Sequence, residues 1–280
     1  MSLQTLSEWL RCPNCFCPLV AHGPLTLTCE AGHSFDVNKR GFVSLLRGSH
    51  KLIGDSAAML DARDSFLAAG WYEPLRDALT SRIAAETPSR VLDVGCGTGY
   101  YLRDVMARGE GTRALALDLS PTAVARTVRG LHNVDGLVAD VWSKLPVRDA
   151  AADVILNVFA PRNAGEFHRV LKSNGLLAVV IPQGAHLQEL RDADLALDVH
   201  PGKTNQLIDT LKPYFRLESR RSFSTVMGLS AREVKALIGM GPSAHHRDAG
   251  RINGDDQSPQ SVTAALELFS FRRSTREHGV

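Results

Sequence analysis

The sequence has no long apolar run and little excess of either charge. Its longest strongly apolar stretch, Leu176–Ile181, is far too short to cross a bilayer. The 32 Lys and Arg residues nearly balance the 30 Asp and Glu residues, so no global basic field indicates nucleic-acid binding. The first ten residues lack the basic and apolar regions of a signal peptide. We therefore expect a cytoplasmic protein with no membrane partner.

Cysteine is also scarce, with five residues in 280, which argues against the disulfide framework of small secreted proteins. Three cysteines and a histidine nevertheless form C-x2-C followed by C-x3-H, at Cys12, Cys15, Cys29 and His33. Thiolate and imidazole ligands at these spacings are typical of tetrahedral zinc. A redox pair of the thioredoxin type would need a βαβ context, which is missing here. We predict a closed structural Zn²⁺ site, in which Cys17 could replace Cys15 only with poorer chelate spacing.

The remaining pattern divides the chain into three segments. Residues 1–47 contain short β-like pieces around the cysteines, which predicts a small zinc ribbon. Residues 48–88 predict two helices, the first of which Gly70 ends. Residues 89–280 alternate short apolar strands with helices, which is typical of a parallel α/β sheet covered on both faces. Extended segments at 215–227 and 262–271, separated by a short helix, predict an antiparallel pair that completes the sheet.

A glycine-rich loop follows the first buried strand of the third segment, where residues 91–99 read V-L-D-V-G-C-G-T-G. Glycines at 95, 97 and 99 allow the backbone to approach a ligand closely. The dinucleotide fingerprint G-x-G-x-x-G would need glycine where Tyr100 stands, which disfavours a nicotinamide dehydrogenase. The acid at Asp93 followed by G-x-G-x-G instead looks like motif I of class I S-adenosylmethionine methyltransferases.

Polar side chains end the next strands. Asp118 is placed to accept the ribose hydroxyls of an adenosine, and Asp140 with Val141 is placed to meet the adenine. Asn157 and Ala160 follow the fourth strand, where the transferred methyl would lie, and are candidates to orient the substrate. Open α/β sheets bind ligands at the carboxyl ends of their strands. We therefore predict a Rossmann-like class I methyltransferase domain that uses S-adenosyl-L-methionine.

With the ribbon and the loop established, the chain resembles the 23S ribosomal RNA (guanine-N1) methyltransferases over nearly its whole length. Besides the zinc ligands and the glycine loop, the shared pieces are Arg40–Leu46, Gly54–Ser56, Ala62–Arg63, Phe66–Leu67, Gly70–Tyr72, Asn157–Pro161, His186–Arg191 and Met240–Ser243. The resemblance implies methyl transfer to N1 of a specific guanine in a 23S rRNA hairpin. Residues 240–246 are more similar to the Gram-positive and actinomycete branch, which is linked with macrolide resistance.

The resemblance also implies roles for individual residues and a homodimer whose two ribbons grip one hairpin. The residues that would bind the cofactor, beside Asp118, Asp140 and Val141, are Tyr72, Asp93, Gly95, Gly97, Thr98, Gly99 and His186. We expect four basic residues to contact RNA phosphates: Lys39, Arg40, Arg47 and Lys51. The alternative is that they are ordinary solvated surface residues. The residue that accepts the N1 proton is not identified; looser candidates than Asn157 and Ala160 are Asp55, His245 and His246.

Two other functions stay open at this point. The first is a methyltransferase that acts on a small molecule or a protein and carries a purely structural ribbon. The second is a non-catalytic RNA-binding protein, against which the intact glycine set and Asp118 argue. Phe159 and Trp142 could stack on the target guanine, or they could belong to the core.

Overall fold

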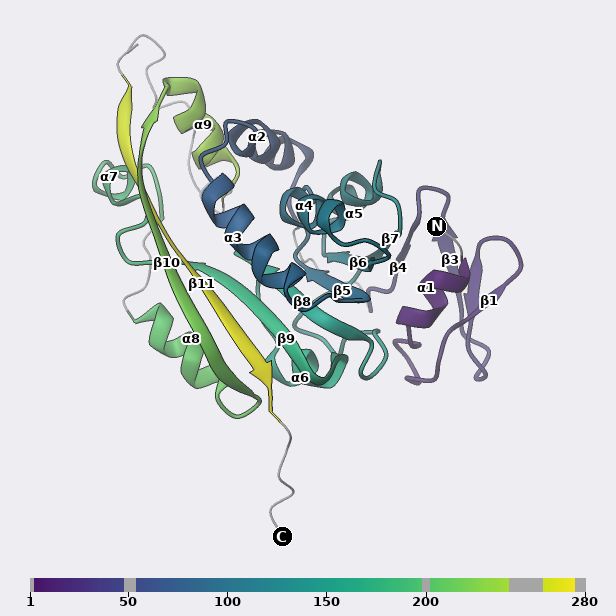
Figure 1. Cartoon of the computed structure of the whole chain (residues 1–280). Coiled ribbons are helices and arrows are strands. Elements are labelled where there is room, and N and C mark those ends of the chain that lie inside the picture. Colours follow the sequence, from purple (N-terminus) through teal and green to yellow (C-terminus); the bar gives the residue numbers. More distant parts are fainter. Residues whose placement is uncertain (1–2, 48–53, 198–201, 242–258, 275–280) are drawn as a thin grey trace.

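The protein is built around one twisted sheet (Figure 1), and the computed structural model describes residues 3–47, 54–197, 202–241 and 259–274. Its eleven strands lie in the order β1-β2-β3-β4-β7-β6-β5-β8-β9-β11-β10. The strands of the third segment are β5 (Arg90–Val94), β6 (Arg113–Asp118), β7 (Val134–Val138), β8 (Ala152–Val158), β9 (Leu171–Pro182), β10 (Phe215–Leu229) and β11 (Gln260–Arg273). Strands β5 to β9 pair parallel with one another, while β11 is antiparallel to both β9 and β10. The predicted α/β sheet with an antiparallel end is confirmed.

The ribbon forms one edge of this sheet. Its strands are β1 (Val20–His22), β2 (Thr26–Thr28), β3 (Ser34–Asn38) and β4 (Phe42–Ser44). Each of these four strands pairs antiparallel with the next one along the chain, and β4 also pairs parallel with β7. The ribbon is therefore hydrogen-bonded directly to the strand that precedes Asp140.

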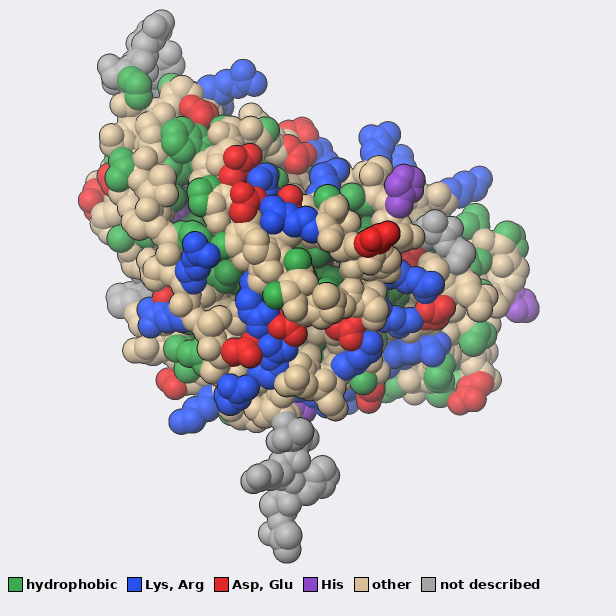
Figure 2. Space-filling view, viewed as in Figure 1, with side chains coloured by type: hydrophobic (Ala, Val, Ile, Leu, Met, Phe, Trp, Pro, Cys, Tyr) green, Lys and Arg blue, Asp and Glu red, His purple; other side chains and the backbone are tan. Residues whose placement is uncertain are grey.

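Helices cover both faces of the sheet. One face carries α2 (Ala57–Leu67), α3 (Glu73–Ala84), α4 (Tyr100–Arg108), α5 (Pro121–Val128), α7 (Gln188–Asp192) and α9 (Ala231–Gly239). The other carries α1 (Leu3–Trp9), α6 (Ala164–Val170) and α8 (Lys203–Leu211). Successive strand residues point to opposite faces, so Val91 packs under the first group and Leu92 under the second. On the outer surface shown in Figure 2, Lys and Arg side chains are interspersed with Asp and Glu, in keeping with the near balance of charge.

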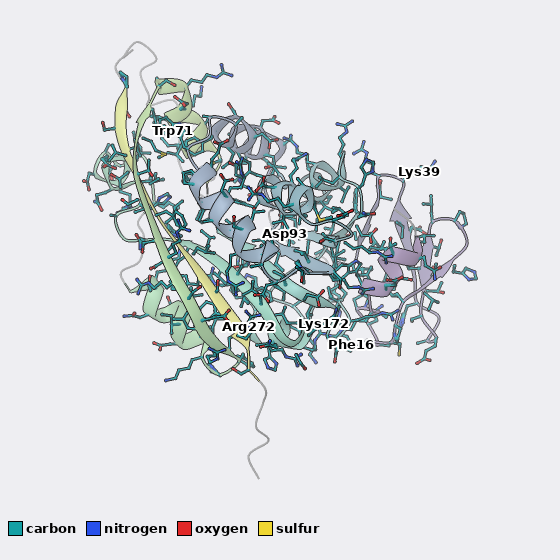
Figure 3. All side chains as sticks on the ribbon, viewed as in Figure 1. Phe16, Lys39, Trp71, Asp93, Lys172 and Arg272 are labelled. Carbon is teal, nitrogen blue, oxygen red and sulfur yellow. The ribbon has the colours of Figure 1, made fainter. Side chains whose placement is uncertain are left out.

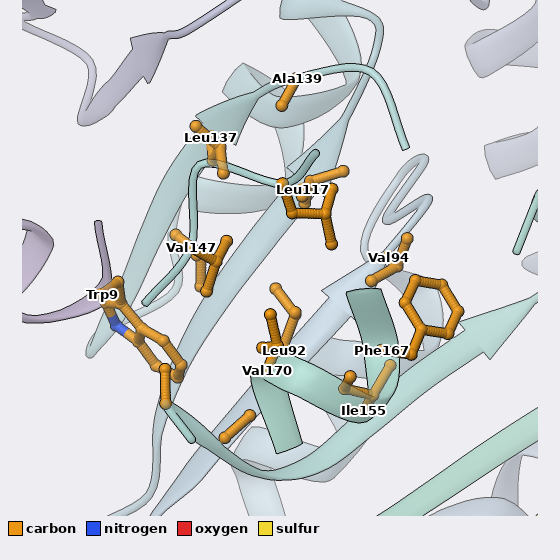
Figure 4. Packing of buried hydrophobic residues seen from close by; sticks show 14 of the residues in the cluster. Trp9, Leu92, Val94, Leu117, Leu137, Ala139, Val147, Ile155, Phe167 and Val170 are labelled. Carbon is orange, nitrogen blue, oxygen red and sulfur yellow. The ribbon is translucent and has the colours of Figure 1, made fainter. Parts of the chain in front are cut away.

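The ribbon shares its core with the second of these faces. Trp9, 1 % exposed, packs in one cluster with Leu92, Val147 and Val170 (Figure 4). Burying a large apolar side chain stabilises a fold by about 1.5–3 kcal/mol, so this contact ties the ribbon firmly to the sheet. The predicted domain boundaries, after residue 47 and after residue 88, stay predictions. Within the described residues, hydrophobic packing continues from the ribbon onto the sheet.

Most predicted elements are present with small shifts of their ends. Ser120 caps α5, since its Oγ accepts a hydrogen bond from Ala123 N at 3.4 Å and Pro121 takes the first helical position. The sequence analysis missed α1, β1 and α7, which are all short. Within the described part of the chain, no helix is both long and apolar enough to cross a membrane.

Candidate active site and metal centre

The glycine loop makes a cradle between β5 and α4. Gly95 and Gly97 adopt φ angles of 81° and 54°, in the left-handed region that glycine favours. A Cβ on Gly95 would lie 2.3 Å from the Cβ of Ala160, so the loop touches the turn that follows β8. The amides of Gly95 and Cys96 both donate to the carbonyl oxygen of Leu117, at 2.8 and 3.0 Å. These bonds hold the loop against the end of β6.

Two carboxyl groups lie beside this cradle. Asp118 accepts hydrogen bonds from Gly97 N and Ser120 N, both at 2.9 Å, so its side chain joins the loop to the end of β6. Asp93, at the centre of the sheet in Figure 3, is only 4 % exposed. Burial, and then the negative charge of Asp118, raises the pKa of Asp93 to about 8. Burial also raises the pKa of Asp118, an effect that the two backbone hydrogen bonds oppose. Near pH 7 Asp93 is therefore largely protonated, and a cationic ligand here would favour its ionised form by offsetting the charge of Asp118.

The third predicted acid faces a cavity. Asp140 accepts hydrogen bonds from Trp142 N at 3.0 Å and Ser143 Oγ at 2.8 Å, and Val141 beside it is partly buried against the core. A cavity of about 370 Å³ is lined by Ser120 and Asp140 on the sheet side and by Arg47 on the ribbon side. This volume lies within the range of small-molecule sites, about 300–1,000 Å³.

The turn after β8 places the candidate substrate residues next to the cradle. Asn157 is fully buried and donates to Val94 O at 3.3 Å and to Pro161 O at 2.9 Å, so it bridges the loop and the turn. Its Oδ1 has no hydrogen-bond partner among the described residues. Phe159, 45 % exposed, has a φ of 53°, which is rare for a bulky residue and typical of functional sites. The core interpretation of Phe159 is therefore wrong, as it is for Trp142, which is 67 % exposed.

The residues assigned to the cofactor by resemblance lie in different parts of this edge. Tyr72 is buried, with its ring centroid 6.2 Å from that of Phe159, and burial raises the pKa of its hydroxyl. Thr98 is buried within the loop, and Gly99 is the N-cap of α4. His186 follows β9, and its Nδ1 accepts a hydrogen bond from Ala265 N at 3.3 Å. Burial, followed by the charges of Arg191 and Lys203, lowers the pKa of His186 to about 4, so the ring is neutral near pH 7.

The four predicted zinc ligands converge in the ribbon. The ligand atoms of Cys12, Cys15, Cys29 and His33 lie within 4.8 Å of one another. His33 Nδ1 is 3.5 Å from Cys12 Sγ and 3.4 Å from Cys29 Sγ, and Cys15 Sγ is 3.5 Å from Cys29 Sγ. Tetrahedral zinc with bonds of about 2.0–2.3 Å separates its ligand atoms by about 3.5–3.8 Å. The donor set fits zinc, and Cys17, whose Sγ donates to Cys15 O at 3.7 Å, lies outside it.

The predicted RNA contacts are exposed where the structure describes them. Lys39, Arg40 and Arg47 are all exposed, and none forms an ion pair with another described residue. Figure 3 shows Lys39 at the outer edge of the ribbon. Lys51 lies outside the described residues, as do the loose proton-acceptor candidates His245 and His246.

Two arginines near the cradle were given no role from the sequence, although Arg63 lies in a piece shared with the family. Arg63 pairs with Asp55 at 2.5 Å and donates to Met240 O at 2.7 Å, and its Nη1 would lie 2.9 Å from a Cβ on Gly97. Asp55 is thus half of an ion pair. Arg162 donates to Ala160 O at 3.1 Å. Arginine on a helix or after a strand has no distinctive sequence pattern, so the available signals were the shared piece Ala62–Arg63 and the Asn157–Pro161 segment beside Arg162.

Comparison with known proteins places this site in a family. A methyltransferase-domain family model matches residues 91–175, and a zinc-ribbon model described as "RlmA, N-terminal" matches residues 10–52. A Streptomyces fradiae protein named 23S rRNA (guanine(748)-N(1))-methyltransferase is 43 % identical over 249 residues, which cover 88 % of this chain and 89 % of that protein. The chain belongs to the 23S rRNA (guanine-N1)-methyltransferase family. A Micromonospora griseorubida protein, provisionally named 23S rRNA (guanine-N(1)-)-methyltransferase, is 40 % identical, with 94 % of this chain and 97 % of the relative covered.

Family membership confirms the prediction that the protein is a 23S rRNA (guanine-N1)-methyltransferase, and that it resembles the actinomycete branch of this family. It also confirms S-adenosyl-L-methionine and Zn²⁺ as the cofactors, and the methyltransferase fold with an N-terminal zinc ribbon. Among solved structures, a Bacillus halodurans protein provisionally described as a methyltransferase aligns with a TM-score of 0.51 at 17 % identity. The alignment covers 71 % of this chain and 98 % of that one, and this likeness shows the fold alone.

Proposed function

We propose that the protein transfers the methyl group of S-adenosyl-L-methionine to N1 of one guanine in a hairpin of 23S rRNA. The observation that carries this proposal is the cavity in which the ribbon meets the cofactor edge of the sheet. Arg47 lines it from the ribbon, and Ser120 and Asp140 line it from the sheet. An RNA segment held by the ribbon would therefore lie beside the cofactor. The names of both actinomycete relatives, which specify N1 of guanine in 23S rRNA, support this substrate.

The residues of the cradle fit the cofactor. Asp118 retains acceptor capacity for two ribose hydroxyls beyond the two amides it already binds, because a carboxylate has about four lone-pair sites. Asp93 lies buried where a positive charge would offset its repulsion from Asp118. Gly95 and Gly97 leave the space that side chains would fill. When bound, the cofactor supplies an electron-poor methyl group on a sulfonium, which needs no metal to react.

The protein's contribution to the reaction is then mainly positioning. In-line displacement requires N1 to be close to the methyl group and aligned with the sulfur. The target base must leave its stack to reach such a site, and it is then commonly held between apolar or aromatic side chains. Phe159, exposed beside Ala160 and Gly95, is placed to stack on it, with Trp142 as a second exposed aromatic.

Asn157 is the strongest candidate to orient the base edge. Its Oδ1 lacks a partner, and an unsatisfied buried acceptor is expensive unless a substrate or water completes it. Both amide hydrogens are already used, which fixes the direction of the side chain. The carbonyl of Ala160 accepts from Arg162 and retains one lone pair for a donor on the guanine.

Basic side chains extend the RNA surface from the ribbon onto α5. A groove of about 420 Å³ is lined by Arg40, Arg126 and Arg129. Arg126 is paired with Asp61 and Asp64, whereas Arg40 and Arg129 are exposed without an acidic partner among the described residues. In Figure 2, blue side chains stand out at the upper right, over α5 and the ribbon edge. Such cations suit backbone phosphates, which dominate affinity for RNA.

The hairpin, the homodimer and the cytoplasmic location complete the proposal. A hairpin loop presents unstacked bases, which is the usual target of sequence-specific RNA recognition. A dimer that grips one hairpin with two ribbons is the arrangement that the family resemblance implies. Light scattering during gel filtration checks it, since the chain has a mass of 30.4 kDa.

Mapping reverse-transcription stops on 23S rRNA tests the reaction, because methylation at N1 blocks base pairing. We expect one new stop after incubation with protein and cofactor, and none when either is omitted. Small metabolites and proteins offered with labelled cofactor are the control substrates. Methyl transfer to one of these, with 23S rRNA unmodified, would favour the alternative in which the ribbon is purely structural.

A further inference from the structure

Two basic side chains beyond the carboxyl ends of β8 and β9, those of Arg162 and Lys203, have no acidic partner in the described part of the chain. Arg162 follows the turn after β8, and Lys203 is the first residue of α8. Both are partly buried, and neither forms an ion pair with a described residue. Most other partly buried arginines here are paired, as Arg169 is with Asp149 and Glu166. A half-buried, unpaired cation is costly, which favours an anionic ligand.

Contacts connect Arg162 directly to the reacting edge of the sheet. Arg162 Nη1 donates to Ala160 O at 3.1 Å, and Ala160 in turn lies against Gly95 of the cradle. The guanidinium is therefore anchored on the residue that follows Phe159, on which the base would stack. Only one of its five N–H groups has a hydrogen-bond partner within the described residues, and the rest remain available to an anion.

The electrostatics of the neighbouring groups are consistent with this position. Burial lowers the pKa of Arg162, and burial together with the charge of Arg162 lowers the pKa of Lys203. Lys203 in turn contributes to the lowered pKa of His186. A carboxylate does lie near α8, but Glu267 is already bound by Thr204 and Arg220. Positive charge is thus concentrated between the turn and the start of α8.

We propose that Arg162 and Lys203 form a phosphate-binding site for the RNA backbone next to the target guanine. This inference rests on the proposed function. A flipped nucleotide needs its backbone held as well as its base, and arginine binds phosphate oxygens in a bidentate manner. The basic residues of the ribbon and α5 lie on the other side of the cofactor edge, so the site would hold the RNA at a second point.

The test compares Arg162→Gln, Arg162→Lys and Lys203→Gln with the wild type. Lys212→Gln, which removes one exposed charge just beyond the other end of α8, is the matched control. The probe is a 23S rRNA fragment that spans the guanine mapped with the wild type. Anisotropy over a range of salt concentrations gives the RNA Kd, and calorimetry gives the cofactor Kd.

We expect Arg162→Gln to weaken RNA binding about tenfold or more at low salt. The salt slope of log K should become shallower by about 0.7–0.9, as expected for one lost phosphate contact. Arg162→Lys, which keeps the charge, should keep the wild-type salt slope. Lys203→Gln should resemble Arg162→Gln. The affinity for the cofactor should not change in any variant.

Two results would overturn the inference. Unchanged RNA affinity and slope in Arg162→Gln would show that no phosphate binds there. Weaker cofactor binding with unchanged RNA binding would assign the arginine to the carboxylate of the cofactor instead. The proposed function fails separately, if the wild type itself leaves 23S rRNA unmethylated.

Discussion

Replacement of Asp118 by alanine offers a quantitative test of the cofactor site. The carboxylate accepts hydrogen bonds from Gly97 N and Ser120 N and would accept two more from the ribose. A hydrogen bond to a charged group contributes about 1.5–3 kcal/mol, so the two ribose bonds together contribute about 3–6 kcal/mol. We therefore expect Asp118→Ala to weaken cofactor binding by at least about 100-fold.

The same substitution also leaves two backbone amides without their acceptor, so stability must be separated from binding. Asp153→Ala is the matched control, because Asp153 accepts hydrogen bonds from Ser89 N at 3.0 Å and Arg90 N at 2.8 Å at the opposite end of the sheet. Both variants should lose stability to a similar extent, about 1–3 kcal/mol. Only Asp118→Ala should lose the cofactor.

Calorimetry with S-adenosylmethionine measures the affinity, thermal melting measures the stability, and a colorimetric assay measures bound zinc. Zinc content should equal that of the wild type in both variants. Equal loss of zinc and cofactor in Asp118→Ala would refute the reasoning, since it would make Asp118 a folding residue. So would equal loss of cofactor affinity in the two variants.

Three further predictions concern the ribbon and the cradle. Cys29→Ser should release zinc and impair RNA binding more than cofactor binding; an equal loss of both would mean that the ribbon supports the cofactor site. Gly95→Ala forces a Cβ to 2.3 Å from Ala160 at a φ of 81° and should abolish measurable cofactor binding. The control is Gly111→Ala, because Gly111 has a φ of 74° but open space around it, and this variant should bind the cofactor like the wild type. Similar effects of the two substitutions would rule out the close contact with Ala160 as the cause. Because the pKa of Asp93 is raised from 3.8 to about 8, the folded state keeps this proton at pH values where the unfolded state has lost it, so the stability of the wild type falls as pH rises through this range. Asp93→Asn should therefore gain thermal stability relative to the wild type between pH 5 and pH 9, and a pH-independent difference in melting temperature would contradict the burial argument.

The features that could be predicted from the sequence are those encoded locally. The glycine loop needs particular residues at fixed spacing, and zinc ligands must chelate one ion, so both leave short patterns. The parallel strands are short apolar runs between helices, which the sequence also shows directly. Asp118 and Asp140 then follow from the position of each strand's end.

The features that were missed depend on contacts between distant residues. Helix α1 is stabilised by burial of Leu6 and Trp9 against the sheet, and nothing within its seven residues indicates that burial. The parallel pairing of β4 with β7 joins residues about ninety positions apart. The significance of Arg162 lies in the absence of an acidic partner within the described part of the chain, which only the folded structure reveals.

The most direct test of the central claim is mass spectrometry of 23S rRNA after incubation with cofactor and either the wild type or Asp118→Ala. Zinc content and folding of the two proteins are matched beforehand. The account predicts one N1-methylated guanine with the wild type and none with the variant under the same conditions. Unmodified RNA with the cofactor-loaded wild type, or equal methylation by both proteins, would contradict it.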